Sequence, residues 1–232
     1  MSILFLLVLV SFCGFTQNNS SIHDNEISKS KYGNGVYDID GNKYKTVIIG
    51  KQEWMAENLK VTKFNDGTLI QNITDTLDWI KFIGPAWCYN ENDSLKNIQF
   101  GKLYNWYAVT SLSKNVCPTG WHVPSEKDWS TLVGSQGEKK YAAEKLKYAE
   151  SNLWLSNNES AINSSLFSAT PAGFRYSNGQ FMVVGYGAYF WSSDDFNKEN
   201  DGVLLIVHNE SSVGGYGGIK KNDAYSIRCL KD

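Results

Sequence analysis

Two stretches of this sequence say most about the fold: Cys117-Pro-Thr-Gly-Trp-His-Val-Pro-Ser125 and, near the C-terminus, Ser226-Ile-Arg-Cys229. Each stretch places one cysteine on an expected structural element, and the two cysteines lie far apart in the chain. In an oxidising compartment, this arrangement predicts a disulfide that closes one long loop around a whole domain. Neither stretch supplies an evident catalytic residue, so both indicate fold more than activity.

A helix is expected directly after the first of these stretches. Ser125 and Asp128 have the spacing of a capping box, in which each side chain satisfies a backbone N–H of the first helical turn. Apolar residues then follow at one-face spacing, and Gly134 is expected to end the helix. A second helix of similar size is predicted over Tyr141–Glu150. The apolar residues of the first helix are Trp129, Leu132 and Val133.

The remaining sequence is dominated by short strands and tight turns. Asp40-Gly41 and Asn178-Gly179 each lie between alternating stretches and predict β-hairpins. Residues 71–97 are irregular and aromatic, and Gly101–Val109 fits a short helix or a buried strand equally well. Two helices followed by many short strands indicate an α+β domain with antiparallel sheets. Further strands are expected at Tyr189–Ser193, Gly202–Val207 and Ala224–Leu230.

Length and charge limit the class of protein. The 232 residues suffice for one sizeable domain or two small ones, and 42% of them are hydrophobic. The 8 Trp and 13 Tyr residues are many for this length, and such side chains provide flat faces for sugars or partner loops. The net charge of −2 gives no electrostatic reason to expect nucleic acid or an acidic membrane surface as a partner.

The N-terminal segment predicts export from the cell. Ile3–Phe15 is an apolar run too short to span a bilayer, which is typical of a signal peptide. We expect residues 1–16 to be removed by cleavage after Thr16. The alternative is a lipid anchor on Cys13, and such an anchor would be the sole contact of the protein with a membrane. Residues 17–34 are polar and are expected to form a flexible tether before a domain at 35–232. The predicted location is secreted or on the outer cell surface.

Removal of Cys13 with the signal would leave an odd number of cysteines. We pair Cys117 with Cys229, which leaves Cys88 over. Cys88 stands among aromatic residues with no His or Lys beside it in sequence, which favours a buried thiol over a reactive nucleophile.

Six segments, in order along about residues 36–232, resemble the Fibrobacter succinogenes major paralogous domain family. That family is similar to the broad C-type-lectin-like group, which also contains the formylglycine-generating enzymes. The resemblance implies a C-type-lectin-like α+β fold and a secreted or surface location of the kind found in Bacteroidetes, and it says less about activity. The segments are Ile49–Leu59, Phe100–Tyr107, Cys117–Pro124, Ala169–Arg175, Phe190–Ser193 and Ser226–Cys229.

The resemblance also argues against two known activities. Calcium-dependent lectins carry a Trp-Asn-Asp triplet whose oxygen atoms bind the metal, and the local match here is Trp191-Ser192-Ser193. Serine hydroxyls do not replace those ligands, and no Glu-Pro-Asn or Gln-Pro-Asp triplet is present. Formylglycine-generating enzymes use a cysteine pair near the C-terminal core, whereas here Cys229 alone lies in that region.

The candidate binding residues lie in stretches rich in glycine and tyrosine. Tyr186, Tyr189 and Tyr216 offer amphipathic faces on bendable loops, although each could instead cover the core. Asp194 and Asp195, with Asn200 and Asp201 after them, could hold Ca²⁺ or could be solvated loop residues, and we predict no metal and no cofactor. His122 is expected to have a packed or hydrogen-bonded structural role.

The sequence therefore predicts a secreted or cell-surface binding module that is not an enzyme. Extracellular polysaccharide is the first expected ligand, because stacked aromatic faces suit sugar rings, and a cell-surface protein is the second. The alternatives are a degenerate relative of the formylglycine-generating enzymes or another extracellular enzyme, and a structural module of the cell envelope.

Overall fold

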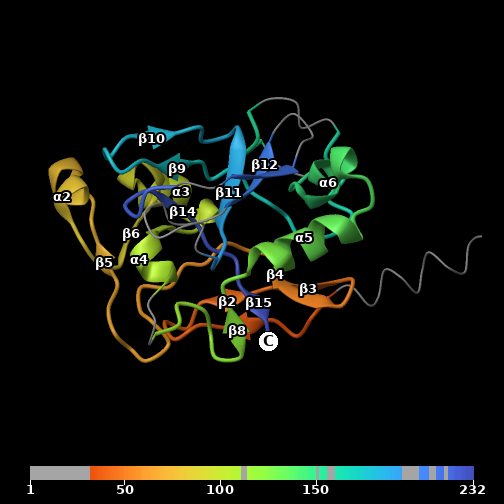
Figure 1. Cartoon of the computed structure of the whole chain (residues 1–232), viewed down its shortest axis with the longest axis horizontal. Coiled ribbons are helices and arrows are strands. Elements are labelled where there is room, and N and C mark those ends of the chain that lie inside the picture. The colour runs from red at the N-terminus through yellow and green to blue at the C-terminus, as the bar shows by residue number, and fades with distance from the viewer. Residues whose placement is uncertain are drawn as a thin grey trace, which may run out of the picture. The chain divides into compact units, whose positions relative to one another are not determined.

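The computed structural model describes residues 32–110, 114–149, 152–155, 160–194, 204–208, 213–216 and 219–232 (Figure 1). These residues all belong to one structural unit, Lys31–Asp232. The expected signal segment 1–16, with Cys13, and most of the expected tether 17–34 lie outside the described residues. No helix among the described residues combines the length and the apolar character that crossing a bilayer requires.

Both predicted tight hairpins are confirmed. β1 (Val36–Tyr37) pairs antiparallel with β2 (Lys43–Tyr44), and β9 (Phe174–Arg175) pairs in the same way with β10 (Phe181–Met182). Gly41 and Gly179 lie at the two turns with φ of 83° each, a left-handed conformation that side chains with a Cβ rarely adopt. The positions of these two turns therefore follow from the local backbone preferences of the Asp-Gly and Asn-Gly pairs.

A four-stranded sheet joins the start, the middle and the end of the unit. Its strands follow the order β3-β4-β15-β8, and the registers between neighbours are antiparallel. Strand β15 therefore lies between a strand from the N-terminal part and a strand from the first cysteine stretch. The strands are β3 (Thr46–Ile49), β4 (Gln52–Met55), β8 (Trp121–His122) and β15 (Leu230–Lys231).

A second sheet of nine described strands runs in the order β13-β12-β11-β14-β7-β6-β5, with the β9–β10 hairpin attached through β14. Two of its pairs, β11–β14 and β5–β6, are parallel, so this sheet is mixed rather than purely antiparallel as the sequence predicted. The strands of each parallel pair are not joined by a tight turn: residues 73–85 lie between β5 and β6, and β12 and β13 lie between β11 and β14. The additional strands are β5 (Gln71–Asn72), β6 (Ala86–Cys88), β7 (Leu103–Asn105), β11 (Gly187–Trp191), β12 (Leu204–His208), β13 (Val213–Tyr216) and β14 (Ala224–Ser226).

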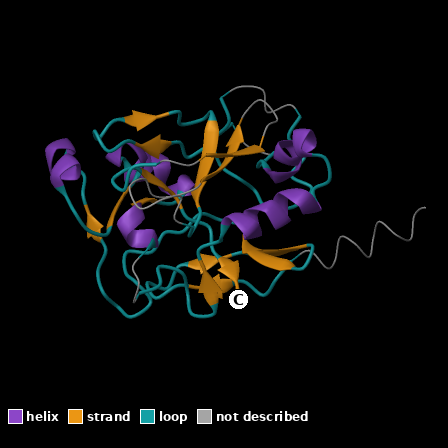
Figure 2. Cartoon of the chain, in the orientation of Figure 1, coloured by secondary structure: helices purple, strands orange, loops and turns teal. Residues whose placement is uncertain are grey.

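Two main helices lie together on one side of the view, as Figure 2 shows in purple beside the long strands. The first, α5 (Glu126–Ser135), begins with the predicted capping box, but it passes through Gly134 and ends one residue later. Gly137, with φ of 87°, supplies the left-handed residue that follows the helix end. The second, α6 (Lys139–Leu146), starts and ends earlier than predicted, because Lys147 is extended and bridges to Ala169.

Short helices occupy segments that the sequence left undecided. The stretch predicted as either helix or strand at 101–109 contains both, since β7 is followed directly by α4 (Trp106–Val109). The irregular stretch 71–97 contains strands β5 and β6 as well as short helices. The remaining helices are α2 (Thr76–Lys81), α3 (Ser94–Asn97) and the 3₁₀ helices η1 (Asn90–Asn92) and η2 (Ile98–Phe100).

The expected closing strand divides between the two sheets. Ala224–Ser226 pairs with β7 in the larger sheet, whereas Leu230–Lys231 pairs with β4 and β8 in the smaller one. The three residues 227–229 cross between the sheets, and the carbonyls of Ile227 and Cys229 accept the N–H groups of Leu59 and Met55. The segment that carries the second cysteine therefore connects the two sheets.

The predicted disulfide is confirmed. Cys117 and Cys229 are bonded across a sequence separation of 112 residues, with a Cα–Cα distance of 5.9 Å. Both cysteines are buried among the aromatic residues of one core cluster. The bond ties the stretch before β8 to the crossing between the sheets.

Aromatic side chains fill the core between the main helices and the sheets. Trp54 stacks on Trp129 with ring centroids 4.6 Å apart. Phe167 packs edge-on against both tryptophans and against Phe190, with centroid distances of 5.8 to 6.2 Å. Such offset and edge-on pairs add stability beyond the burial of their area. The many tryptophans of the sequence thus serve the core first, and Trp191 among them is fully buried.

The capping box offers a direct test of local stability. Ser125→Ala removes the acceptor for the Asp128 N–H and is expected to lower the free energy of unfolding by about 1 kcal/mol, measured by urea denaturation. Thr131→Ala is the matched control, because Thr131 lies exposed on the same helix and its hydroxyl bonds only to the Lys127 carbonyl. Equal effects of the two substitutions would contradict the capping role.

Candidate functional site

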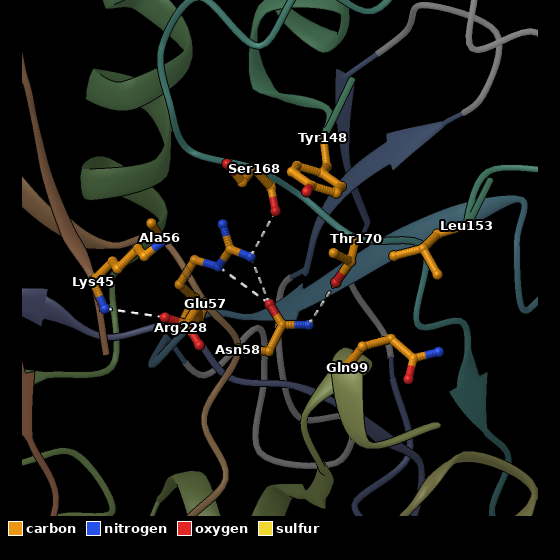
Figure 3. Close-up of a pocket in the computed structure, with 10 residues that line it drawn as sticks. All are labelled: Lys45, Ala56, Glu57, Asn58, Gln99, Tyr148, Leu153, Ser168, Thr170 and Arg228. Atoms are coloured by element: carbon orange, nitrogen blue, oxygen red, sulfur yellow. Dashed lines mark hydrogen bonds between the residues drawn. The ribbon is translucent and has the colours of Figure 1, made fainter. Parts of the chain in front are cut away.

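A pocket of about 270 Å³ opens beside the crossing between the sheets. Its walls come from segments far apart in the sequence: the residues around β3 and β4, the 3₁₀ helix η2, the chain after α6, and residues 168–170. Figure 3 shows the lining side chains directed around a common space. They are Lys45, Ala56, Glu57, Asn58, Gln99, Tyr148, Leu153, Ser168, Thr170 and Arg228.

The base of the pocket is a buried pair formed by Arg228 and Asn58. The Arg228 guanidinium donates to Asn58 Oδ1 from Nε at 3.2 Å and from Nη2 at 2.8 Å. It also donates to the carbonyl of Ser168 at 3.2 Å and to the carbonyl of Phe167. The guanidinium lies 4.2 Å from the Phe167 ring centroid, where the ring face attracts a cation.

Asn58 extends this base to the other walls. Its Nδ2 donates to the Phe100 carbonyl at 2.9 Å, to Ser226 Oγ at 3.2 Å and to Thr170 Oγ1 at 3.4 Å. Because both amide atoms are engaged, the side chain is held in one orientation. The base of the pocket is therefore a rigid network rather than a set of movable side chains.

The charges at the pocket are fixed by burial and by pairing. Burial lowers the pKa of the Arg228 guanidinium to about 9, and Glu57 opposes that shift, so the group stays protonated at neutral pH. Burial raises the pKa of Glu57, but the backbone N–H of Lys45 and the ammonium of Lys60 outweigh burial and hold that pKa below its usual value. Glu57 is therefore an ionised hydrogen-bond acceptor and not a proton donor.

The opposite wall is apolar. Tyr148 and Leu153 are half-buried, and the N–H of Tyr148 bonds to the Ala169 carbonyl at 3.0 Å. In Figure 3 these two side chains lie on the side of the pocket opposite Glu57, with Thr170 between. One wall thus presents a ring and an aliphatic chain, and the other presents hydrogen-bonding groups, which is the usual make-up of a small-molecule site.

Two of the three tyrosines singled out in the sequence, Tyr186 and Tyr189, are not among the described residues that line this pocket. Tyr189 packs edge-on against Phe174, with centroids 4.9 Å apart, and burial raises its pKa. Tyr186 is 46% exposed at the turn before β11, and its N–H bonds to the Val183 carbonyl. Tyr216 belongs to strand β13, and its side chain lies outside the described residues.

Of the acidic stretch noted in the sequence, Asp194 is the one member that the structure describes. Asp194 Oδ2 accepts the Glu126 N–H and the Ser192 hydroxyl, the latter at 2.9 Å, so it supports the start of α5. Asp195, Asn200 and Asp201 lie outside the described residues. Among the residues that are described, no group of three or more His, Cys, Asp or Glu side chains is arranged to hold a metal ion.

His122 and Cys88 have the structural roles that the sequence predicted. His122 Nδ1 lies 2.6 Å from Asp232 Oδ1, and its Nε2 lies 3.6 Å from Asp128 Oδ2. Cys88 is a free buried thiol. Burial raises its pKa to about 12 despite the nearby Arg175, so the thiol is inert at neutral pH.

Several pocket residues lie in the segments that carry the family resemblance. Three of the six segments that carry the family resemblance supply pocket residues: Glu57 and Asn58 from one, Thr170 from another, and Arg228 from the last. Polar or charged residues that stand beside apolar ones in these segments, such as Asn58 before Leu59 and Arg228 after Ile227, were the available clue, because burying such groups requires partners.

Comparison with known families gives one match. The family model described as the Fibrobacter succinogenes major domain matches residues 47–231, from within β3 to the end of β15. The matched range includes every residue that lines the pocket except Lys45. Comparisons with curated proteins and with solved structures found no match.

Proposed function

The chain belongs to the Fibrobacter succinogenes major domain family, and on that premise we propose that it is a secreted or cell-surface module that binds polysaccharide without catalysing a reaction. The observation that carries the proposal is the pocket above the Arg228–Asn58 base. A sugar ring has an apolar face of C–H groups and an edge of hydroxyls. The Tyr148 wall suits the face, and the polar wall suits the edge.

The size and the rigidity of the pocket support the same ligand. A volume of about 270 Å³ lies just below the range of ~300–1,000 Å³ that is typical of small-molecule sites, which fits one sugar ring at a time. The base is fully hydrogen-bonded within the protein, so binding costs little ordering of its side chains.

The chemistry of the pocket favours binding over catalysis. Glycoside hydrolysis commonly uses a pair of carboxyl groups, and the described residues that line the pocket include one carboxylate, Glu57, already paired with Lys60 at 2.9 Å. The cysteine chemistry of the formylglycine-generating enzymes requires reactive thiols, whereas Cys229 is in the disulfide and the Cys88 thiol is buried.

We include a C-type-lectin-like architecture in the proposal. Three described features support it: the two consecutive main helices, the long-range disulfide, and the pairing of β4 with the C-terminal strand β15. Together they bring both ends of the domain to one sheet and leave the long middle segments to form the binding face.

A cell-surface protein is the second candidate ligand. Helix α2 and the turn after it expose a group of apolar side chains, and Figure 1 shows this helix on the side of the larger sheet away from α5 and α6. Exposed apolar groups of this kind often mark protein contacts. They are Leu77, Ile80 and Ile83, which are 63%, 45% and 81% exposed.

The proposal predicts that Tyr148 contributes directly to sugar binding. On an array of neutral and acidic polysaccharides, Tyr148→Ala is expected to weaken binding about tenfold or more, because an aromatic face is lost from the site. Tyr37→Ala is the matched control, since Tyr37 is 61% exposed and does not line the pocket. The array is read both with calcium and with chelator.

Three results would contradict the proposal in different ways. Binding that Tyr186→Ala abolishes and Tyr148→Ala leaves unchanged would place the site on the turn before β11. Binding lost with chelator would mean that a metal takes part. Absence of binding to every polysaccharide, together with a partner captured through α2 and lost in Leu77→Ser, would favour the protein ligand.

A further inference from the structure

A second pocket lies at the C-terminal end of α5. It has a volume of about 240 Å³ and takes its walls from the end of β3, the end of α5, α6 and the loop before Phe167. Most of its polar groups are hydroxyls and amides, and the exposed Ile48 adds an apolar contact. The lining residues are Ile48, Ile49, Gly50, Ser135, Gln136, Lys145, Ser164 and Ser165.

The two pockets are neighbours because two segments contribute to both. On one side, Lys45 lines the first pocket and Ile48 lines the second. On the other side, Ser168 lines the first and Ser165 lines the second. Three residues of extended chain reach at most ~10 Å, so the Cα atoms of the corresponding lining residues are no farther apart than that.

The loop between the pockets, residues 163–168, is held in an unusual conformation. Asn163, Leu166 and Ser168 have φ of 45°, 60° and 58°, the left-handed region that residues other than glycine seldom occupy. Conformations of this kind persist where the surroundings enforce them, and they cluster at binding sites.

Hydrogen bonds fix this loop from three sides. Asn163 and Ser168 bond to each other twice, from Ser168 N–H to Asn163 Oδ1 at 3.0 Å and from Asn163 Nδ2 to Ser168 Oγ at 2.9 Å. Ser165 Oγ donates to the Lys145 carbonyl at 2.6 Å. From below, Arg228 donates to the carbonyls of Phe167 and Ser168. The loop is therefore a rigid divider, and the base of the first pocket supports it.

We infer that the two pockets are subsites for sugar units of one polysaccharide chain that passes over the divider loop 163–168. The inference rests on the proposed function and adds that the ligand is recognised as an extended chain rather than as a single sugar or a chain end. Two covalently linked units bind together more tightly than either alone, because the second binds at a high effective concentration. Affinity should therefore rise with chain length until both pockets are filled.

The test uses cello-, xylo- and manno-oligosaccharides from disaccharide to hexasaccharide, titrated into the whole domain by calorimetry. For a responding series, the hexasaccharide is expected to bind at least tenfold more tightly than the disaccharide. Ser164→Trp fills the second pocket with an indole and should remove that gain, so that the hexasaccharide and the disaccharide bind with similar affinity. Ser94→Trp is the matched control, because Ser94 is equally exposed but lies on α3, outside both pockets.

The outcomes separate this inference from the function on which it rests. Equal affinity for short and long chains, with binding lost in Tyr148→Ala, would overturn the second subsite and leave the proposed function standing. A gain with length that survives Ser164→Trp would place the second contact elsewhere and would also overturn the inference. Absence of binding by every series, with polysaccharide binding also absent, would overturn both.

Discussion

Replacing Cys117 and Cys229 together by alanine lowers the free energy of unfolding by about 3–5 kcal/mol, the loss expected when a disulfide no longer restricts a long loop in the unfolded chain. The bond closes a separation of 112 residues, so the unfolded chain gains much freedom when it is removed. It also joins the stretch before β8 to the crossing between the sheets. Urea denaturation of the oxidised protein and of the variant measures the difference.

Reductant provides the control for this measurement. It should destabilise the wild-type protein about as much as the double substitution does, and it should leave the Cys117→Ala/Cys229→Ala variant unaffected. Cys88 does not complicate the comparison, because its thiol is buried and its pKa is raised to about 12. A variant as stable as the wild type would show that the sheets alone hold the crossing in place.

Arg228→Met is expected to lower the free energy of unfolding by a similar amount, about 3–5 kcal/mol. Methionine fills part of the volume but donates no hydrogen bond, so the buried oxygen atoms that Arg228 contacts lose their partner. Each unsatisfied buried polar group costs roughly 1–3 kcal/mol. The guanidinium also leaves the faces of Phe167 and Phe190.

Two further variants show whether the loss comes from this network. Lys231→Met removes a positive charge three residues away in the sequence, where the side chain is exposed and pairs with Glu53. This substitution should lower the free energy of unfolding by less than ~1 kcal/mol. Asn58→Leu alone and combined with Arg228→Met completes a double-mutant cycle, in which a coupling of ~0.5–3 kcal/mol is expected. A coupling near zero would mean that Arg228 and Asn58 stabilise the fold independently.

Arg228 also links stability to recognition in the proposed function. Arg228 lies in the crossing, and its partners lie in the segment after β4 and in the divider loop, so one side chain joins three segments that line the first pocket. Arg228→Lys keeps the charge but cannot reach all of these acceptors. The free energy of unfolding of this variant should therefore lie between those of the wild type and Arg228→Met. Its hexasaccharide binding should be weaker than its loss of stability alone explains.

Much of the secondary structure could be predicted because local interactions determine it. The capping residues Ser125 and Asp128 placed the start of α5, and the two glycines at positions 41 and 179 placed the hairpin turns. The helix ends were less accurate, because tertiary pairing decided them. Lys147 leaves α6 to bridge with Ala169, and nothing near Lys147 in the sequence specifies that partner.

The candidate site could not be predicted in the same way. The sequence favoured the tyrosines on glycine-rich loops, since their composition suits binding. Tyr189 instead packs against the core, and Asp194 serves the start of α5. The pocket arises where residues 58, 170 and 228 meet, and no local pattern connects positions so far apart.

The sequence by itself determined the family, the mixed α+β class, the pairing of Cys117 with Cys229 and the start of the first main helix. These depend on residue identity and on neighbours within a few positions. The tertiary structure alone decided the division of the last strand between two sheets and the burial of Arg228 beneath the pocket. A buried guanidinium is stable only where several acceptors converge on it, and that convergence exists only once the distant segments have packed together.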